Sequence, residues 1–190
     1  MRKLPDKVQP KNKTQLKQLI DYAFKHDIYD LNFIDTSKIT DMSELFEDVK
    51  HNFDISCWDV SNVTNTEFMF DCCFEFKGKG LENWDVSNVT NMRHMFGGCK
   101  NFNCDLSNWD VSNVTDMTSM FGFCNTFDCD LSYWDVSNVT DMYSMFTMCK
   151  NFKGKGLENW DVSKAEDMRY MFSGCDKMTI PNWYKLYHKK

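Results

Sequence analysis

The sequence has no long apolar run and no recognisable leader. No apolar stretch reaches the roughly 18 residues that a transmembrane helix needs, so we expect no membrane span. Residues 1–13 carry five Lys and Arg side chains, but no apolar segment follows them and no lipid-attachment cysteine lies near the start. This is not the pattern of a signal peptide, and it favours a location inside a cell or within an assembled particle.

An excess of basic residues is also missing. Lys and Arg number 22 against 28 Asp and Glu, which gives a net charge of −6. A nucleic-acid-binding protein usually presents a basic face, so we do not expect nucleic acid as a partner.

The residue patterns of metal sites and of nucleophilic enzymes are absent as well. There is no Cys-x-x-Cys pair, and the four His residues do not fall in register with the cysteines, so no metal site is expected. No His has a Ser, Cys or Asp that the sequence would place beside it. We therefore expect a protein that is not an enzyme and that needs no cofactor.

What the chain does contain is one phrase that recurs. Trp58, Trp84, Trp109, Trp134 and Trp160 each open a copy, at spacings of 26, 25, 25 and 26 residues. A degenerate copy starts at Ile34, and Trp183 begins one that is not completed. A period of about 20–50 residues is typical of stacked repeats. We divide the chain into a basic segment and capping helix (1–33), the repeats (34–180) and a C-terminal cap (181–190).

Each copy combines two hydrophobic periods. Trp109 and Val111 alternate with polar residues, which indicates a strand with one buried face. The apolar residues that follow have the spacing of a helical stripe. They are Met117, Met120, Phe121 and Cys124. The prediction is an α/β repeat solenoid with about 25 residues per coil, each coil a short strand, a turn and a short helix.

Stacking the copies turns each apolar position into a column. These columns predict the core, because no single copy can bury its own apolar set. The three clearest are Ile55, Leu81, Leu106, Leu131, Leu157 and Ile180; Phe76, Phe102, Phe127 and Phe152, continued by Met178; and Phe70, Phe96, Phe121, Phe146 and Phe172.

An amphipathic helix precedes the repeats. Its apolar residues are Leu16, Leu19, Ile20, Ala23 and Phe24. We expect Thr14 to cap the helix and the helix to shield the first coil. A helix that lies on a membrane surface is the alternative.

Five of the nine cysteines recur at the same place in each copy, on the apolar stripe. They are Cys73, Cys99, Cys124, Cys149 and Cys175. The regular placement and the odd total favour reduced, buried thiols. Disulfides between adjacent coils are the alternative.

A ladder of carboxylates follows the tryptophans. Its members are Asp59, Asp85, Asp110, Asp135 and Asp161, preceded by Asp35 in the degenerate copy. Stacked carboxylates repel, so each needs a hydrogen-bond donor or a cation. One reading is hydrogen bonding within turns. The other is a face for a basic or periodic ligand, or for calcium, although the glycine-rich nonapeptide usual in calcium-binding repeats is missing.

The copies differ at two adjacent positions in the apolar-stripe segment. Arg93, His94, Tyr143, Arg169 and Tyr170 occupy these positions in three of the copies. Such residue types are enriched in protein interfaces, so we predict a protein-binding surface there. Plain solvated surface is the alternative.

The full phrase Trp-Asp-Val-Ser-Asn-Val-Thr-Asp-Met-x-x-Met-Phe, seen from Trp109 to Phe121, closely resembles the BspA-like leucine-rich repeat family. That family includes a repeat of unknown function first catalogued in mycoplasma proteins. The resemblance covers about residues 31–180 and implies a cell-surface setting, adhesion or protein binding, and no catalytic residues.

We therefore expect a non-enzymatic protein-binding scaffold whose partner is another protein or copies of itself. The alternatives are a structural component of a virus particle or surface layer, and a carbohydrate-binding adhesin.

Overall fold

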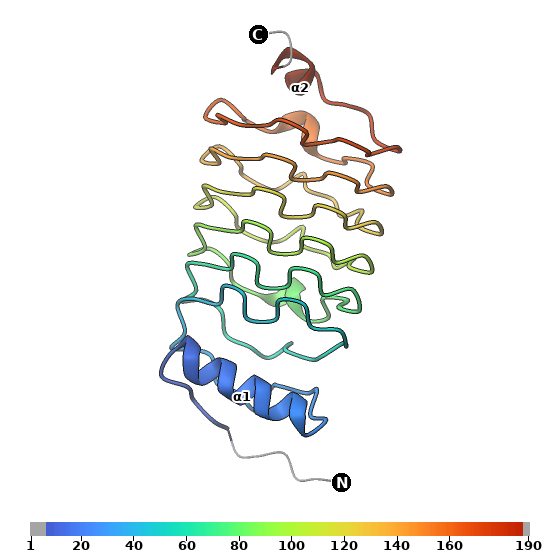
Figure 1. Cartoon of the computed structure of the whole chain (residues 1–190). Coiled ribbons are helices and arrows are strands. Elements are labelled where there is room, and N and C mark those ends of the chain that lie inside the picture. The colour runs from blue at the N-terminus through green and yellow to red at the C-terminus, as the bar shows by residue number, and fades with distance from the viewer. Residues whose placement is uncertain (1–6, 188–190) are drawn as a thin grey trace.

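The computed structural model describes residues 7–187, which form a stack of coils with an α-helix at each end (Figure 1). The first helix, α1, is Lys13–Lys25, and the last, α2, is Asn182–Tyr187. Two 3-10 helices, η1 (Leu81–Asn83) and η2 (Leu157–Asn159), lie within the coils. Most of the remaining chain in this range is turn or irregular.

The predicted α/β repeat solenoid is wrong. Within residues 7–187 no strand forms, and both α-helices lie outside the repeats. Neighbouring coils are joined instead by isolated parallel bridges. One continuous series of them links Asp41, Asn65, Asn91, Asp116, Asp141 and Asp167.

Consecutive turns replace the expected helix in each repeat. The N–H of Met120 donates to the carbonyl of Met117 at 3.1 Å, and Cys124 donates to Phe121 at 3.0 Å. The third residues of these turns, Ser119 and Phe123, have φ values of 51° and 63°, which type II turns use and an α-helix cannot. Two such turns give four apolar residues the spacing of a helical stripe, so the stripe is buried although no helix forms.

The backbone hydrogen bonds between coils run in one sense along the turn segment, residues 117–123 in this copy. The N–H of Phe96 donates to the carbonyl of Met120 at 2.9 Å, and Phe121 donates to Met145 at 2.9 Å. Along this segment each coil therefore presents backbone donors to the next coil and acceptors to the previous one. A stack built in this way is directional, and its two ends need different caps.

The predicted apolar columns form the core. The rings of Phe96 and Phe121 lie 5.7 Å apart and are inclined by 11°, and those of Phe121 and Phe146 lie 5.6 Å apart at 7°. All three side chains are fully buried. Burying each one contributes roughly 1.5–3 kcal/mol. The columns lose full burial only at the C-terminal end, where Met178 and Ile180 are partly exposed.

Helix α1 covers the acceptor end of the stack. Leu16, Ile20 and Ala23 are fully buried, so its apolar face is not available to a membrane surface. Asn12, and not Thr14, caps the helix, because its side-chain oxygen accepts the N–H of Gln15 at 3.0 Å.

Side chains from both helices meet the free backbone groups at the ends. From α1, the Nζ of Lys17 donates to the carbonyl of Leu45 in the first coil at 2.8 Å. From α2, the hydroxyl of Tyr187 accepts the N–H of Met168 in the last coil at 3.3 Å. Each helix thus supplies one of the partners that a further coil would have supplied.

Candidate binding groove

The carboxylates of the ladder accept hydrogen bonds from the residues that follow them in the same turn. Oδ1 of Asp85 accepts the N–H of Ser87 at 3.1 Å and its hydroxyl at 2.6 Å. Backbone hydrogen bonds of the same kind occur at Asp59, Asp110, Asp135 and Asp161. Hydrogen bonds from the following serine hold the pKa of Asp85, Asp135 and Asp161 below the usual range.

A metal site is not formed by the ladder or elsewhere in residues 7–187. No group of three or more His, Cys, Asp or Glu side chains in this range is arranged to hold an ion.

The predicted protein-binding residues fall into two clusters. In the first, Arg93 Nε lies 3.6 Å from a carboxylate oxygen of Glu67. The ring of His94 stacks on Phe68 with centroids 4.7 Å apart, and its Nδ1 lies 3.5 Å from Oδ1 of Asp71.

The second cluster lies two coils further on. Tyr143 and Tyr170 meet edge to face at 5.7 Å, and the guanidinium carbon of Arg169 lies 5.7 Å from the centroid of the Tyr143 ring. Arg169 also forms two parallel contacts with Asp167, Nε to Oδ1 at 3.0 Å and Nη2 to Oδ2 at 2.5 Å. These hydrogen bonds lower the pKa of Asp167.

A groove of about 460 Å³ spans four coils and begins at the first cluster. His94 and Asp71 line one end, and Ser144 and Thr147 line the other. Of the predicted residues only His94 lines the groove itself, since Arg93, Tyr143, Arg169 and Tyr170 are not among its lining.

Aromatic side chains and small residues give the groove its apolar character. Phe123 is 54% exposed, although its backbone is in the left-handed region at φ 63°. Phe74 is also in the lining, and Lys50 and Lys100 each hold Nζ 4.7 Å from the centroid of its ring. Gly122 is a further lining residue and adds no side chain to the groove.

Phe74, Lys100, Gly122 and Phe123 were not predicted as site residues. The signal was present in the sequence, because glycine and phenylalanine replace one another at equivalent places in successive copies, as at Gly98 and Phe123. This exchange of glycine and phenylalanine can be interpreted only once the turn conformation shows that these positions face outward.

All nine cysteines are free thiols. In the buried column each sulfur donates to a carbonyl of the preceding coil, for example Cys124 to Phe96 at 3.0 Å. Burial raises the pKa of Cys73 to about 12 and that of Cys124 well above its ordinary value. Neutral thiols of this kind pack and donate, and they are poor nucleophiles.

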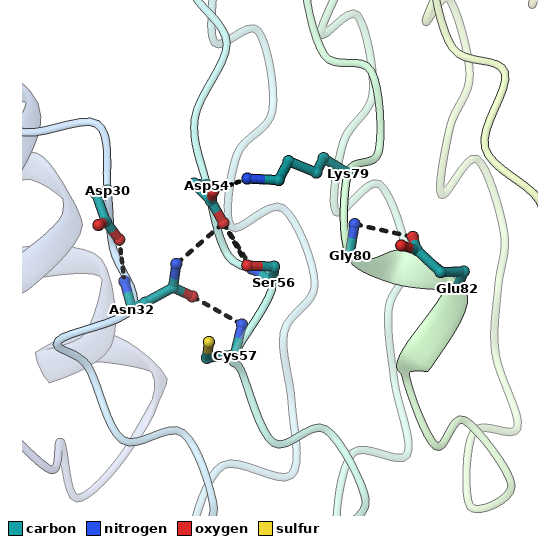
Figure 2. Close-up of polar contacts among 8 residues, drawn as sticks. All are labelled: Asp30, Asn32, Asp54, Ser56, Cys57, Lys79, Gly80 and Glu82. Carbon is teal, nitrogen blue, oxygen red and sulfur yellow. Dashed lines mark hydrogen bonds and ion pairs between the residues drawn. The ribbon is translucent and has the colours of Figure 1, made fainter.

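A separate polar network ties the chain after α1 to the coils (Figure 2). The carboxylate of Asp54 accepts from Asn32 at 2.9 Å and from Lys79 at 2.8 Å, and also from the backbone and hydroxyl of Ser56. The side-chain oxygen of Asn32 accepts the N–H of Cys57 at 2.8 Å. This network joins three successive levels of the stack and is structural.

No helix within residues 7–187 has the length and apolar content to cross a membrane.

Comparison with known proteins places the chain in a family without assigning an activity. No curated protein and no solved structure matches it. A family model described as "Mycoplasma protein of unknown function, DUF285" matches residues 14–79 and again residues 68–183. Since the two matches together cover most of the sequence, the protein belongs to the DUF285 family.

Proposed function

We propose that the protein is a non-enzymatic scaffold of the BspA-like repeat type that binds another protein. The observation that carries the proposal is the groove, which is apolar, partly open and located on the face where the copies differ. A groove of this size lined by aromatic and small residues is typical of a binding site. The resemblance of the repeat phrase to proteins that act in adhesion or protein binding supports the same function.

The backbone around the groove favours a preformed site. The N–H of Phe123 donates to Thr147 at 2.7 Å, and that of Gly98 donates to Gly122 at 2.7 Å, so neighbouring coils hold the groove in shape. A ligand that enters a rigid groove loses less free energy to ordering of the protein. The nine free thiols suit a reducing compartment, inside a cell or within a particle.

Binding of a co-purified partner to variants tests this function. We expect His94→Ala and Phe123→Ala each to weaken partner binding by more than about fivefold, since both line the groove and aromatic residues at the centre of an interface can cost over about 1 kcal/mol on truncation. Tyr133→Ala is the control, because Tyr133 is 83% exposed and lines a different hollow of the surface. Equal binding by all three variants would argue against this face.

The C-terminal end of the stack favours a second function, that of a structural component. In the inner coils the N–H groups equivalent to those of Tyr170 and Gly174 donate to the next coil, whereas these two have no acceptor among residues 7–187. Copies stacked end to end could supply those acceptors. Sedimentation velocity over a wide concentration range tests this, and a constant monomer would exclude it.

A further inference from the structure

Gly122 is a glycine that the fold does not require. Its φ is not in the left-handed region, and a Cβ at this position would meet only ordinary contacts, the nearest being the carbonyl of Ser119 at 3.4 Å. In the next coil the equivalent residue is Thr147, whose hydroxyl donates to the carbonyl of Tyr170 at 2.7 Å. The missing side chain at Gly122 therefore keeps space open in the groove without serving the backbone.

Phe123 is an aromatic residue that neither the core nor the backbone favours. Its side chain is 54% exposed and its φ is 63°, a region that costs a non-glycine residue about 1–2 kcal/mol. The equivalent residues two coils on and one coil back are Gly174 and Gly98. Met148, in the coil between Phe123 and Gly174, is also 38% exposed with φ 60°. Of these two side chains only Phe123 lines the groove, and it adds apolar surface there at a conformational cost.

The groove lining also contains a positive charge, that of Lys100. Lys50, Lys100 and Lys150 occupy equivalent places in three coils, with Phe74 between the first two. Lys50 is paired with Asp48 at 2.6 Å, but neither Lys100 nor Lys150 contacts a carboxylate in the described part of the chain. Of these lysines only Lys100 lines the groove, so one cation without a carboxylate partner faces an apolar groove in a protein whose net charge is −6.

From these observations, and resting on the proposed function, we infer that the groove binds an extended segment of a partner protein in which an aromatic or long aliphatic side chain is flanked by Asp or Glu. The apolar side chain enters the space that the missing side chain of Gly122 leaves, next to Phe123. An Asp or Glu beside it meets Lys100, which lines the groove. Four coils at about 4.8 Å extend over roughly 15–20 Å, which accommodates about five extended residues.

The test is selection from a displayed library of random peptides of about ten residues, twice the length that the groove accommodates. The full chain is the bait, and the Gly122→Thr variant is used to remove peptides that bind elsewhere. We expect the enriched peptides to share an aromatic or aliphatic residue flanked by Asp or Glu. Enrichment of basic or uncharged sequences, or no enrichment over the variant, overturns the inference.

Fluorescence anisotropy with the most enriched peptide then measures the groove directly. We expect Gly122→Thr to weaken binding by about tenfold or more, and Lys100→Glu by about fivefold with a smaller dependence on salt. Tyr133→Ser should bind within about twofold of the unchanged protein, as expected for an exposed residue outside an interface. Unchanged affinity in Gly122→Thr overturns the inference.

Controls distinguish a loss of peptide binding in the groove from a loss of folding and from a failure of the proposed protein-binding function. Gly122→Thr reproduces the side chain of Thr147, so its thermal unfolding should match that of the parent protein. Lys100→Glu changes the charge of the groove lining and leaves Gly122 in place, so it serves as a second variant that tests the same inference. If a co-purified partner still binds Gly122→Thr as tightly as the parent, the protein-binding function stands and the groove inference fails.

Discussion

The phenyl rings of Phe70 and Phe96 lie 5.4 Å apart and are inclined by only 2°. The two residues are 26 positions apart in the sequence. Phe70 stacks in the same way on Phe46 of the preceding coil, and Phe96 on Phe121 of the following one. Stability of the stack therefore comes mainly from contacts between coils, and each coil depends on its neighbours.

Removal of one ring from this column should be costly. We expect Phe96→Ala to lower the free energy of unfolding by about 3–5 kcal/mol, because the side chain is fully buried and leaves a cavity. Phe123→Ala is the matched control, and its effect should stay below about 1 kcal/mol since the side chain is half-exposed. Urea unfolding followed by tryptophan fluorescence measures both. Similar losses would contradict the assignment of the columns as the core.

A glycine substitution distinguishes turns from a helix in the repeats. Ser144 has φ 54°, so Ser144→Gly should relieve strain and stabilise the protein by up to about 1 kcal/mol. In a helix the same change would destabilise by roughly 0.5–1 kcal/mol. The measurement is the urea midpoint of Ser144→Gly. A rise in the midpoint supports turns, and a fall supports a helix.

These positive φ values explain why the fold was only partly predictable. The repeat period identified Phe121 and Cys124 as core residues, and both are fully buried. The spacing of those residues fits a helix and a pair of turns equally well. Ser119 and Phe123 are not residue types that favour a left-handed backbone, so their positive φ values could not be predicted. Helical periodicity was therefore correct about the buried face and wrong about the backbone.

The groove was missed for a related reason. The copies differ most visibly at the positions of Arg93 and His94, so the sequence predicts the binding surface there. Phe74, Gly122 and Phe123 line the groove from positions slightly further along the copy, which a helix would have placed on another face. Only His94 was both predicted and found in the lining.

Glycines with a left-handed backbone should behave in the opposite way to Gly122. Gly156 has φ 90°, and a Cβ there would lie 2.3 Å from the backbone nitrogen of Ser132. Gly156→Ala should therefore destabilise the protein by more than about 2 kcal/mol, through strain and a backbone clash. Gly122→Ala should change the unfolding free energy by less than about 0.5 kcal/mol. The same urea measurement compares the two, and equal effects would refute the distinction drawn here.

The network around Asp54 should make stability depend on pH. Burial alone would raise the pKa of Asp54, but hydrogen bonds from Lys79, Ser56 and Asn32 outweigh it and hold the pKa well below the usual range. Since the folded pKa is the lower one, the stabilisation is complete above about pH 4 and is lost as the pH falls through the folded pKa.

Asp54→Asn tests that network. We expect a loss of about 1–2 kcal/mol at neutral pH that shrinks below about pH 4. The loss should also be smaller when Lys79→Met is already present, because the ion pair is then absent. Additive effects at every pH would show that the two side chains are not coupled.

Thiol labelling should follow burial. Cys57 is the one cysteine classed as exposed, and burial raises the pKa of Cys104 to about 12 and of Cys129 to about 11. We expect iodoacetamide at mildly alkaline pH to modify Cys57 first, and Cys99, Cys124 and Cys149 only after denaturation. Peptide mass spectrometry gives the order. Early labelling of Cys124 in the folded protein would contradict the buried column.

The most direct test of the central claim is cross-linking of the protein to its partners in the native source, read by mass spectrometry. The account predicts one dominant foreign protein, joined through Lys100 in the lining of the groove, and loss of that link with Gly122→Thr. Links to copies of the same chain alone, or foreign links confined to lysines away from the groove such as Lys38 and Lys77, would contradict it.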